Sequence, residues 1–488
     1  MNEQAEFLLT MEGLEQAEIH GLGSFTTRFS PISHASDNKT LVMKQPAWNN
    51  NGIGYDTISR PDVSHGFFVE NALALLDEAN EWYLNTTSET VYYKPPNGTD
   101  IRSMYLVLGK LEQLLVVGGT YDKPAHDITF RGFNYMHSTW NLPSSDVGYV
   151  DQQTGGFMGL NESYSVFESS RPYWWQVPGA IQVSAARDIT FQNGSLAASM
   201  GGFGIGNDPN AHVTEVGLGT TRIEISGMYL HQTGTNAITM GGIQEDAHHP
   251  SDPRMLNSDS RITENIFADV ALTYNSGVAV FVSYTAGTQI THNDVSNVPY
   301  SGICYGYGWG SNDAGGSPEY LRRGLYNYQP IYDTPTVMRD GIISGNLVNN
   351  FGLTHSDLGG IYTLSASPNT TISDNWVFGS PNGAAIYNDE GSRFYYANNS
   401  VFNTTAFWVT RNERTNYTTG NLTYANIAST VPFDPALATN EWGDRLINIT
   451  QWTSFENLTQ AHKDVVFDAG IPVGQRAGRP VSVNQERL

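Results

Sequence analysis

Short hydrophobic runs that end in a polar or glycine residue recur along the middle of the chain. Residues 126–132 (HDITFRG) are followed by 187–193 (RDITFQN) and 222–227 (RIEISG). A shorter form, isoleucine and two polar residues before asparagine, ends at four positions spaced 28, 53 and 29 residues apart: Asn265, Asn293, Asn346 and Asn375. Periods of this size indicate one small structural unit that is stacked on itself many times.

Each unit combines β-branched residues with asparagine and glycine and has no helical period. This combination is typical of a parallel β-helix, whose successive coils lie about 4.8 Å apart. Asparagine suits the corners because it tolerates a left-handed backbone and can hydrogen-bond to the asparagine of the next coil. The sequence therefore predicts an all-β fold, a right-handed parallel β-helix (solenoid) with a small appended β module and a short C-terminal helix.

The pattern divides the chain into four parts. Residues 1–65 are irregular and are interpreted as incomplete opening coils. Residues 66–123 are predicted to form the appended module, with a helix over 70–79 and a hairpin between 81–84 and 90–93. Residues 124–430 form the predicted catalytic β-helix domain, and 431–488 a C-terminal extension with a helix near 454–468.

Three long insertions interrupt the repeats, at residues 140–176, 244–259 and 305–339. Insertions in a repeat scaffold usually gather on one face, and that face usually carries the ligand site. We therefore expect the first and third insertions to border a single groove.

The strongly negative net charge argues against two classes of binding partner, nucleic acids and anionic lipid surfaces. The 488 residues contain only 25 Lys and Arg, and the net charge is −23. Binding to nucleic acid requires a basic face, and an anionic lipid surface repels an acidic protein. The chain also has no run of about 20 apolar residues that could span a membrane. We expect no nucleic-acid partner, no membrane partner and a monomer.

Glycosylation sequons (Asn-x-Ser/Thr) recur in the predicted loops, which indicates an extracellular, N-glycosylated protein. The first residues show neither a basic segment nor an apolar segment, so we expect the secretory leader to be missing from this chain. Cys304 is the only cysteine, which rules out an intramolecular disulfide and suggests a small buried hydrophobe. The sequons include Asn38, Asn85, Asn97, Asn161, Asn193, Asn369, Asn403, Asn416, Asn421, Asn448 and Asn457.

Two tyrosines stand out when the repeats are aligned on Ile303, Ile361 and Ile386. Side chains alternate across a strand, so core-facing isoleucines would direct Tyr362 and Tyr387 outward. Two outward tyrosines on neighbouring coils would form an exposed aromatic strip. Such a strip either binds the faces of sugar rings or simply shields the sheet.

Acidic residues flank these tyrosines. Asp357 precedes the strand of Tyr362, while Asp389 and Glu390 follow the strand of Tyr387. Paired carboxylates are the minimal set for cleaving a glycosidic bond, although each one alone also fits ordinary turn chemistry. In straight strands Asp357 and Asp389 would be roughly 23 Å apart. For the two carboxylates to meet, we therefore expect the chain to turn a corner before Gly359-Gly360. Glu390 is a substitute candidate for the role of Asp389.

Several phrases resemble the right-handed parallel β-helix repeat proteins that include glycoside hydrolase family 141, with its fucosidase and xylanase activities. They include EWYL at 81–84, DLGGIY at 357–362 and IYNDEGS at 386–392. The resemblance covers roughly residues 60–430. It implies a carbohydrate-active enzyme with catalytic carboxylates at the positions that match Asp357 and Asp389.

The leading hypothesis is a secreted glycoside hydrolase that acts on a plant or microbial polysaccharide. No cofactor and no metal ion is expected for this reaction. Asp357 and Asp389, or Glu390 in its place, would act as acid and as base or nucleophile. The candidate substrate-binding residues are aromatic, with one histidine added: Tyr362, Tyr387, Trp309, Tyr307, Trp174, Trp175 and His355.

Two alternatives stay open. A polysaccharide lyase usually needs a cation and a Lys or Arg base, but no lysine occurs between Lys123 and Lys463. Arginines remain available for that role. A non-catalytic carbohydrate-binding wall protein would use the aromatic residues alone, and its acidic residues would only shape turns.

Overall fold

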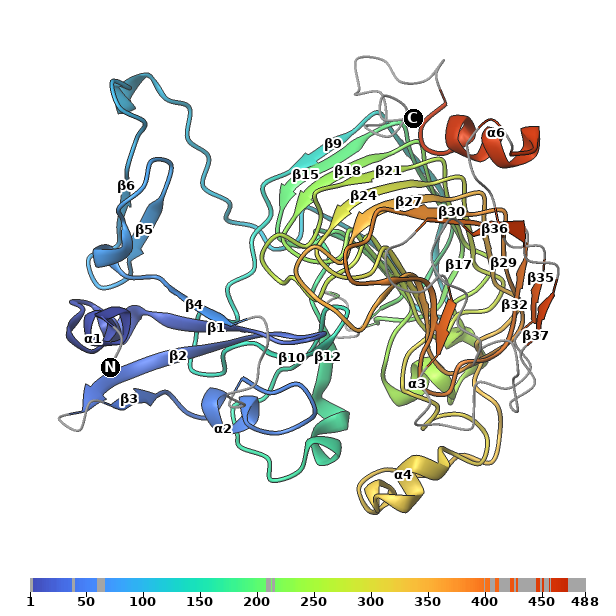
Figure 1. Ribbon diagram of the computed structural model, residues 1–488, viewed down its shortest axis with the longest axis horizontal. Helices are drawn as coiled ribbons and strands as arrows, with labels where there is room; N and C mark the ends of the chain where they lie inside the picture. The colour runs from blue at the N-terminus through green and yellow to red at the C-terminus, as the bar shows by residue number, and fades with distance from the viewer. Residues whose placement is uncertain are drawn as a thin grey trace. The chain divides into compact units, whose positions relative to one another are not determined.

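The computed structural model of the 488-residue chain describes most of the sequence up to residue 403 (Figure 1). The long described ranges are 3–36, 40–58, 66–207 and 216–398. The shorter ones are 212, 400–403, 409–411, 422–424, 427–428, 445–447, 450–451, 456 and 458–472. The predicted C-terminal extension, 431–488, therefore lies largely outside the described residues.

Two compact units make up the chain. The first contains Met1–Gly109, Asn141–Gln152 and Phe157–Tyr173. The second contains Lys110–Trp140, Gln153–Gly156 and Trp174–Leu488. The domain boundaries predicted from the sequence stay predictions, because the units are defined by packing and not by independent folding.

The first unit is built on a four-stranded antiparallel sheet in the order β3-β2-β1-β4. The strands are β1 Glu18–Leu22, β2 Thr27–Ser36, β3 Thr40–Met43 and β4 Phe67–Glu70. The helices are α1 Glu3–Thr10, η1 Leu14–Gln16 and α2 Ala47–Asn51. Apolar side chains from these elements form one buried cluster, namely Met11, Leu14, Ala17, Ile32, Met43 and Ala72.

The hairpin predicted in this unit is confirmed. Strands β5 Trp82–Asn85 and β6 Thr90–Tyr93 pair in antiparallel register. The helix predicted over 70–79 is wrong, since only the short 3-10 helix η2 Leu73–Leu75 forms there. Asn71 and Asn80 have positive φ angles of 71° and 74°, and such a backbone cannot continue a right-handed helix. A further 3-10 turn, η3, spans Ile101–Ser103.

A separate small sheet has the strand order β10-β11-β12. Its strands are β10 Val150–Gln153, β11 Gly156–Met158 and β12 Trp174–Gln176. Between β11 and β12 lies the 3-10 helix η4 Phe167–Tyr173.

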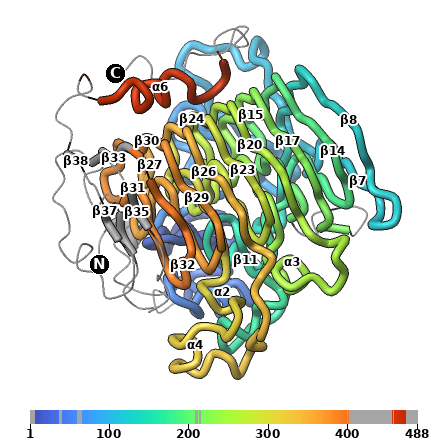
Figure 2. Tube along the Cα trace, turned by 90° about the vertical axis from the view of Figure 1, so that its right-hand side faces the viewer, coloured from blue at the N-terminus to red at the C-terminus, as the bar shows by residue number. Residues whose placement is uncertain are grey.

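Parallel sheets dominate the second unit (Figures 1 and 2). The first parallel sheet contains β7 Leu115–Gly118, β13 Ile181–Ser184, β16 Phe203–Ile205, β19 Ile238–Met240, β22 Val280–Val282, β25 Ile303–Tyr305, β28 Gly359–Thr363, β31 Ala384–Asn388 and β34 Val409–Arg411. The second contains β8 Ala125–Arg131, β14 Ala186–Gln192, β17 Thr220–Ser226, β20 Arg261–Thr263, β23 Gln289–Thr291, β26 Ile342–Ser344, β29 Ala366–Ser373, β32 Arg393–Asn398, β35 Leu422–Tyr424 and β37 Arg445–Ile447.

The third parallel sheet contains β9 Asn134–Met136, β15 Ser195–Ser199, β18 Tyr229–Thr233, β21 Ile266–Ala268, β24 Asp294–Val298, β27 Leu347–Phe351, β30 Trp376–Phe378, β33 Val401–Asn403, β36 Ile427–Ala428 and β38 Thr450–Gln451. Within each sheet, neighbouring strands come from successive repeats of the chain. Equivalent residues of the repeats are therefore hydrogen-bonded neighbours.

The alignment of the repeats is confirmed by the strand register. Ile303 pairs with Ile361, and Ile361 pairs with Ile386 in the next strand; all three are buried. The four predicted asparagines are also buried and form a ladder, in which Asn293 Nδ2 donates to Asn346 Oδ1 at 3.0 Å. The same contact joins Asn265 to Asn293 and Asn346 to Asn375.

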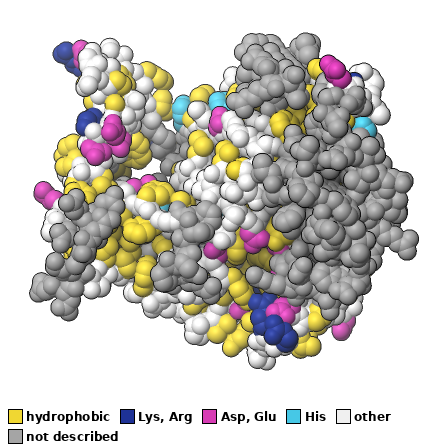
Figure 3. Space-filling model, in the orientation of Figure 1, with side chains coloured by type: hydrophobic (Ala, Val, Ile, Leu, Met, Phe, Trp, Pro, Cys, Tyr) yellow, Lys and Arg dark blue, Asp and Glu magenta, His cyan; other side chains and the backbone are white. Residues whose placement is uncertain are grey.

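Short helices lie in the insertions and near the C-terminus. They are α3 Glu245–His248, η6 Pro253–Met255, α4 Pro318–Arg322 and η7 Leu325–Asn327. Figure 3 shows acidic and basic side chains together over α4, where Arg322 forms an ion pair with Glu319. The predicted C-terminal helix is present as α6 Gln460–Asp468, which packs on Leu347 and Trp376. None of the helices described is long and apolar enough to cross a membrane.

The fold class predicted from the sequence, a single right-handed parallel β-helix solenoid with appended pieces, is corrected. The described residues instead form parallel sheets of nine, ten and ten strands packed side by side and, in the other compact unit, an antiparallel sheet with helices. Residues 1–65 are not opening coils, because β1 pairs with β2 and β4 in antiparallel register. The repeat pattern identified which residues stack but not how the rest of the chain folds.

Candidate active site

The candidate site lies on two neighbouring strands of the first parallel sheet, β28 and β31. Tyr362 and Tyr387 are direct partners in the register of these strands, and their ring centroids are 5.2 Å apart. The two rings meet edge to face, with an angle of 80° between their planes. This contact places both phenol groups beside the ends of the strands that carry the acidic residues.

The corner that brings Asp357 toward this point lies at Asp357 itself. Its φ angle of 53° is in the left-handed region, which aspartate tolerates better than most residues. The corner predicted before Gly359-Gly360 is therefore present, but the two glycines do not form it, because both lie within β28. A Cβ atom on Gly360 would lie 2.3 Å from Val377 Cγ1, so close packing requires glycine there.

Each tyrosine donates a hydrogen bond to the acidic residue that flanks the neighbouring strand. Tyr387 donates from its hydroxyl to Asp357 Oδ1 at 2.7 Å. Tyr362 donates to Asp389 Oδ2 through a short hydrogen bond. The phenol pair therefore bridges the two acidic residues that the sequence separates by many positions. Each carboxylate is fixed by a neutral donor from the adjacent strand.

Two residues that the sequence analysis missed complete this network. Tyr300 is fully buried, and its hydroxyl donates to the backbone oxygen of Asp357 at 3.1 Å. Gln153 Nε2 donates to the hydroxyls of Tyr300 at 2.6 Å and Tyr362 at 3.3 Å. The one feature of the sequence that could have identified Tyr300 is its position directly before the aligned Ser-Gly-Ile phrase of its repeat. Gln153 lies in the first insertion, and no feature of the sequence indicated that it belongs to the site.

Burial controls the ionisation of the tyrosines. It raises the pKa of Tyr362 well above 10, and the negative charge of Asp389 raises it further. The pKa of Tyr387 is raised by the same two causes in the same order. For Tyr300 burial is again the largest cause of a raised pKa. All three phenols therefore stay protonated at any working pH and act as hydrogen-bond donors.

Exposure differs from the prediction. Tyr362 is 1% exposed and Tyr387 is 6% exposed, so the expected aromatic strip on the surface is wrong. Asp389 and Glu390 are likewise buried, at 6% and 8%. Asp357 is exposed. The tyrosines thus form the interior support of the acidic residues, and solvent reaches the group through Asp357.

Aromatic side chains of the first and third insertions meet beside this group. Trp174 and Trp309 pack edge to face with ring centroids 6.3 Å apart, and Tyr307 lies 5.1 Å from Trp309. Gly310 approaches Gly391 so closely that a Cβ atom on Gly391 would lie 2.5 Å from Gly310 Cα. The third insertion therefore packs on the turn that carries Asp389 and Glu390. The predicted groove itself stays a prediction.

The remaining candidate residues occupy different surroundings. Trp174 and Tyr307 are buried, while Trp309 and Trp175 are partly exposed. His355 is fully buried, with its ring centroid 5.9 Å from that of Tyr300. His355 is therefore placed to support Tyr300 and not to touch a ligand from solvent.

An ion pair fixes the start of the strand after the acidic turn. Arg393 donates from Nη2 to Asp313 Oδ2 at 3.3 Å, and the same oxygen accepts the backbone N–H of Ala366 at 3.0 Å. Burial raises the pKa of Asp313, and Arg393 partly opposes this effect. The pair joins the third insertion to β32 and stabilises the position of the turn between them.

Replacing Tyr387 by phenylalanine tests the phenol support. We expect kcat/KM to fall roughly 10- to 100-fold, because a hydrogen bond to a charged group contributes roughly 1.5–3 kcal/mol. The measurement is steady-state kinetics on any substrate that a screen of the chain identifies. Tyr396→Phe on β32 is the control, since that side chain is 38% exposed. Equal losses in both variants would contradict the proposed support.

Comparison of this chain with known proteins shows a similarity in fold to a solved structure, but no match in sequence to a family model. No protein-family model matches the chain, and no curated protein matches it. A solved structure named "Glycoside hydrolase" aligns with 97% of this chain and 74% of its own, at 20% identity and a TM-score of 0.71. Another, "The complex structure of XylC with xylose", covers 66% of this chain and 49% of its own at 13% identity and a TM-score of 0.36, too low to carry an argument. The first likeness shows that this chain shares the fold of a solved structure named as a glycoside hydrolase.

Proposed function

We propose that the protein is a glycoside hydrolase that cleaves a polysaccharide or oligosaccharide with a pair of carboxylates. The observation that carries this proposal is the crossed arrangement of Tyr362 with Asp389 and Tyr387 with Asp357 on neighbouring strands. Glycosidic cleavage needs one carboxyl group to protonate the leaving oxygen and another to act as base or nucleophile. The fold neighbour, which is named as a glycoside hydrolase, supports the same reaction class.

The two carboxylates differ in access to water, and this difference suggests their roles. Asp357 is exposed, which suits a base or nucleophile that water or substrate must reach. Asp389 is buried and accepts a hydrogen bond from Tyr362, which fixes the direction of its carboxyl group, and we assign it the role of proton donor. Glu390, one residue further on, is the substitute proton donor. The phenols only orient these groups, because they stay protonated.

The raised pKa values of the tyrosines also bear on the alternative reaction. A lyase needs a base that removes a proton next to a uronate, and an ionised tyrosine could in principle serve. Burial prevents that ionisation in Tyr362 and Tyr387. Arg393, one of the arginines available for the role, already pairs with Asp313. These observations favour hydrolysis over β-elimination.

The finer parts of the proposal rest on the sequence. The phrases DLGGIY and IYNDEGS support a place near glycoside hydrolase family 141, with a plant or microbial polysaccharide as substrate. The sequons support an extracellular, N-glycosylated protein. Trp309 and Trp175, both partly exposed, are proposed as sugar subsites, since hydrophobic and aromatic side chains line most small-molecule pockets.

The proposal is tested by incubating the purified chain with a panel of plant and fungal glycans and identifying the products by mass spectrometry. A hydrolase releases sugars whose mass includes one water for each cleaved bond. A product that lacks this water and absorbs ultraviolet light would overturn hydrolysis in favour of a lyase. Binding without any product, unaffected by Asp357→Asn, would instead indicate a carbohydrate-binding protein.

Trp309→Ala tests the proposed subsite. We expect KM to rise about tenfold with little change in kcat, because a lost stacking contact of roughly 1.4 kcal/mol weakens binding of substrate and transition state alike. Steady-state kinetics on the released-sugar assay measures both constants. Trp82→Ala in the hairpin is the control, since Trp82 is 65% exposed and belongs to the other unit. An unchanged KM in Trp309→Ala would remove Trp309 from the subsites.

A further inference from the structure

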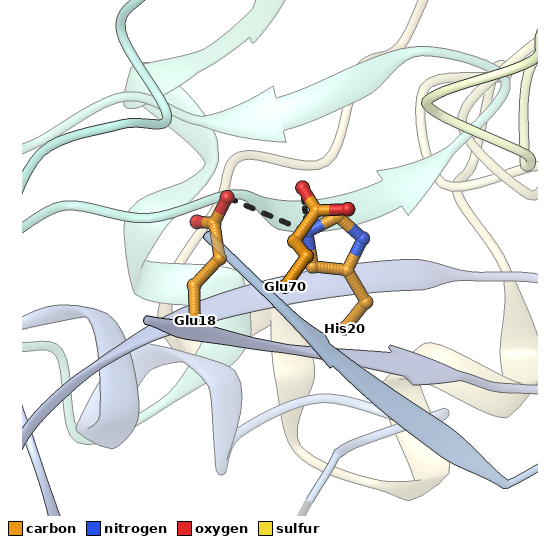
Figure 4. A group of neighbouring side chains, drawn as sticks. All are labelled: Glu18, His20 and Glu70. Carbon is orange, nitrogen blue, oxygen red and sulfur yellow. Dashed lines mark ion pairs between the residues drawn. The ribbon is translucent and has the colours of Figure 1, made fainter. Parts of the chain in front are cut away.

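A second group of titratable side chains lies in the antiparallel sheet of the first unit. Glu18 and His20 are two positions apart on β1 and share one face of the sheet. Glu70 on β4 is the direct cross-strand partner of Glu18. Figure 4 shows the two carboxylates converging on the imidazole. The three residues are the one group of potential metal ligands found among the described residues, with ligand atoms within 4.8 Å of one another.

This pairing is unfavourable without a cation. Like charges that lie directly opposite each other destabilise a pair of strands. Glu18 is only 8% exposed, so water screens its charge weakly. A cation placed between the two carboxylates would convert this repulsion into attraction.

The imidazole of His20 provides the independent observation. His20 is 2% exposed, and neither of its ring nitrogens has a hydrogen-bond partner among the described residues. Its Nε2 atom nevertheless lies 3.1 Å from Glu70 Oε1 and 3.5 Å from Glu18 Oε1. The ring stacks on Phe29, with centroids 3.5 Å apart and planes at 11°. The buried Nε2 atom thus lies at ion-pair distance from two carboxylate oxygens, and Nδ1 has no hydrogen-bond partner among the described residues.

The spacing of these atoms suits a metal ion. Ligands that bind zinc at about 2.0–2.2 Å in tetrahedral geometry lie about 3.3–3.5 Å from one another. The two nitrogen–oxygen separations, 3.1 and 3.5 Å, lie close to this range, and all three ligand atoms lie within 4.8 Å of one another. We propose that Glu18, His20 and Glu70 bind one divalent transition-metal ion of the zinc type, which clamps β1 to β4.

The chemistry of the three ligands sets the class of metal. Imidazole nitrogen is a ligand for zinc, iron, nickel and copper, whereas calcium and magnesium prefer oxygen ligands alone. Two carboxylates and a neutral imidazole carry two negative charges, which a divalent ion balances. The Glu70 side chain is 48% exposed, so the ion has a route from solvent and a water molecule can fill its fourth position.

The competing occupant is a proton. Burial lowers the pKa of His20, but the two neighbouring carboxylates outweigh this effect and raise the pKa above 6.5. A protonated His20 would pair with both carboxylates and leave no place for a metal ion. The two occupants make opposite predictions for a metal-binding experiment.

The test is titration of the full chain, stripped of metal at pH 7.5, with zinc chloride in a calorimeter and with cobalt chloride in a spectrophotometer. We expect one zinc ion per chain and a visible cobalt absorption band, with no competition from calcium or magnesium. Glu70→Gln should weaken zinc binding at least about tenfold, because one of three ligands loses its charge. Zinc should also raise the melting temperature of the native chain but not that of Glu70→Gln.

Glu12→Gln in the same unit is the matched control, since Glu12 is exposed. It should bind zinc like the native chain. The half-exposed position of Glu70 makes its amide variant compatible with folding, which circular dichroism verifies. Equal zinc binding by the native chain and Glu70→Gln, or no binding by either, would overturn the proposal and leave a protonated His20 as the occupant. The outcome does not depend on the proposed hydrolase activity.

Discussion

Replacing Asp389 by asparagine is expected to lower turnover by a factor of at least 10² while leaving the fold unchanged. The amide has the same shape and can still accept the hydrogen bond that Tyr362 donates to this side chain. It can neither donate a catalytic proton nor act as a base, and general acid–base catalysis typically contributes 10²–10⁴ in rate. The measurement is kcat on the glycan that the screen identifies, with circular dichroism to verify folding.

The companion variant Asp357→Asn should show a loss of similar size, since both carboxylates are needed for cleavage. Asp468→Asn on α6 is the control, because Asp468 is exposed and its charge plays no part in the proposed reaction. Full activity in Asp389→Asn together with a large loss in Glu390→Gln would transfer the proton-donor role to Glu390. Full activity in Asp357→Asn would remove the proposed pair altogether.

Replacing Asn346 by alanine is expected to destabilise the second unit by about 3–5 kcal/mol, since each buried polar group left unsatisfied costs roughly 1–3 kcal/mol. The Asn346 amide donates to Ile290 O at 2.8 Å and to Asn375 Oδ1 at 3.0 Å. Its Oδ1 accepts the backbone and side-chain N–H groups of Asn293, both at 3.0 Å. Alanine leaves several of these buried groups without partners.

Urea unfolding followed by tryptophan fluorescence measures this loss as a lower transition midpoint. Asn382→Ala is the control, because the Asn382 side chain is exposed in a turn. Its midpoint should shift by no more than the equivalent of about 0.5 kcal/mol. Similar midpoints for the two variants would show that the asparagine ladder contributes little to stability.

The ladder also shows what a repeat pattern determines. Identical residues that recur at the same point of successive repeats become neighbours when the repeats stack. The sequence therefore predicted the contacts of Asn293 with Asn346 and the register of Ile361 with Ile386. The hairpin at residues 82–93 and helix α6 were predictable for a similar reason, since both are local.

The predicted fold class was wrong because it extended the repeat beyond the residues that carry it. Nothing local in residues 18–36 distinguishes a strand that stacks in parallel from one that pairs in antiparallel register. That choice depends on which partner strand buries the apolar face, and β4 lies some fifty residues further along the chain. The predicted exposed strip of Tyr362 and Tyr387 was wrong for a similar reason. The alternation of side chains along a strand shows which way a side chain points, but it does not show which other residues cover it.

By itself, the sequence determined the stacked repeat, the asparagine ladder, the hairpin and the acidic and aromatic phrases that became candidate residues. Only the tertiary structure decided that Tyr362 donates to Asp389 and that Tyr387 donates to Asp357. The same holds for the hydrogen bond from Gln153 to Tyr300 and for the ion pair between Glu70 and His20. The physical reason is distance along the chain. Periodicity and propensity report on neighbours in sequence or in register, whereas these contacts join side chains whose approach depends on the packing of the whole chain.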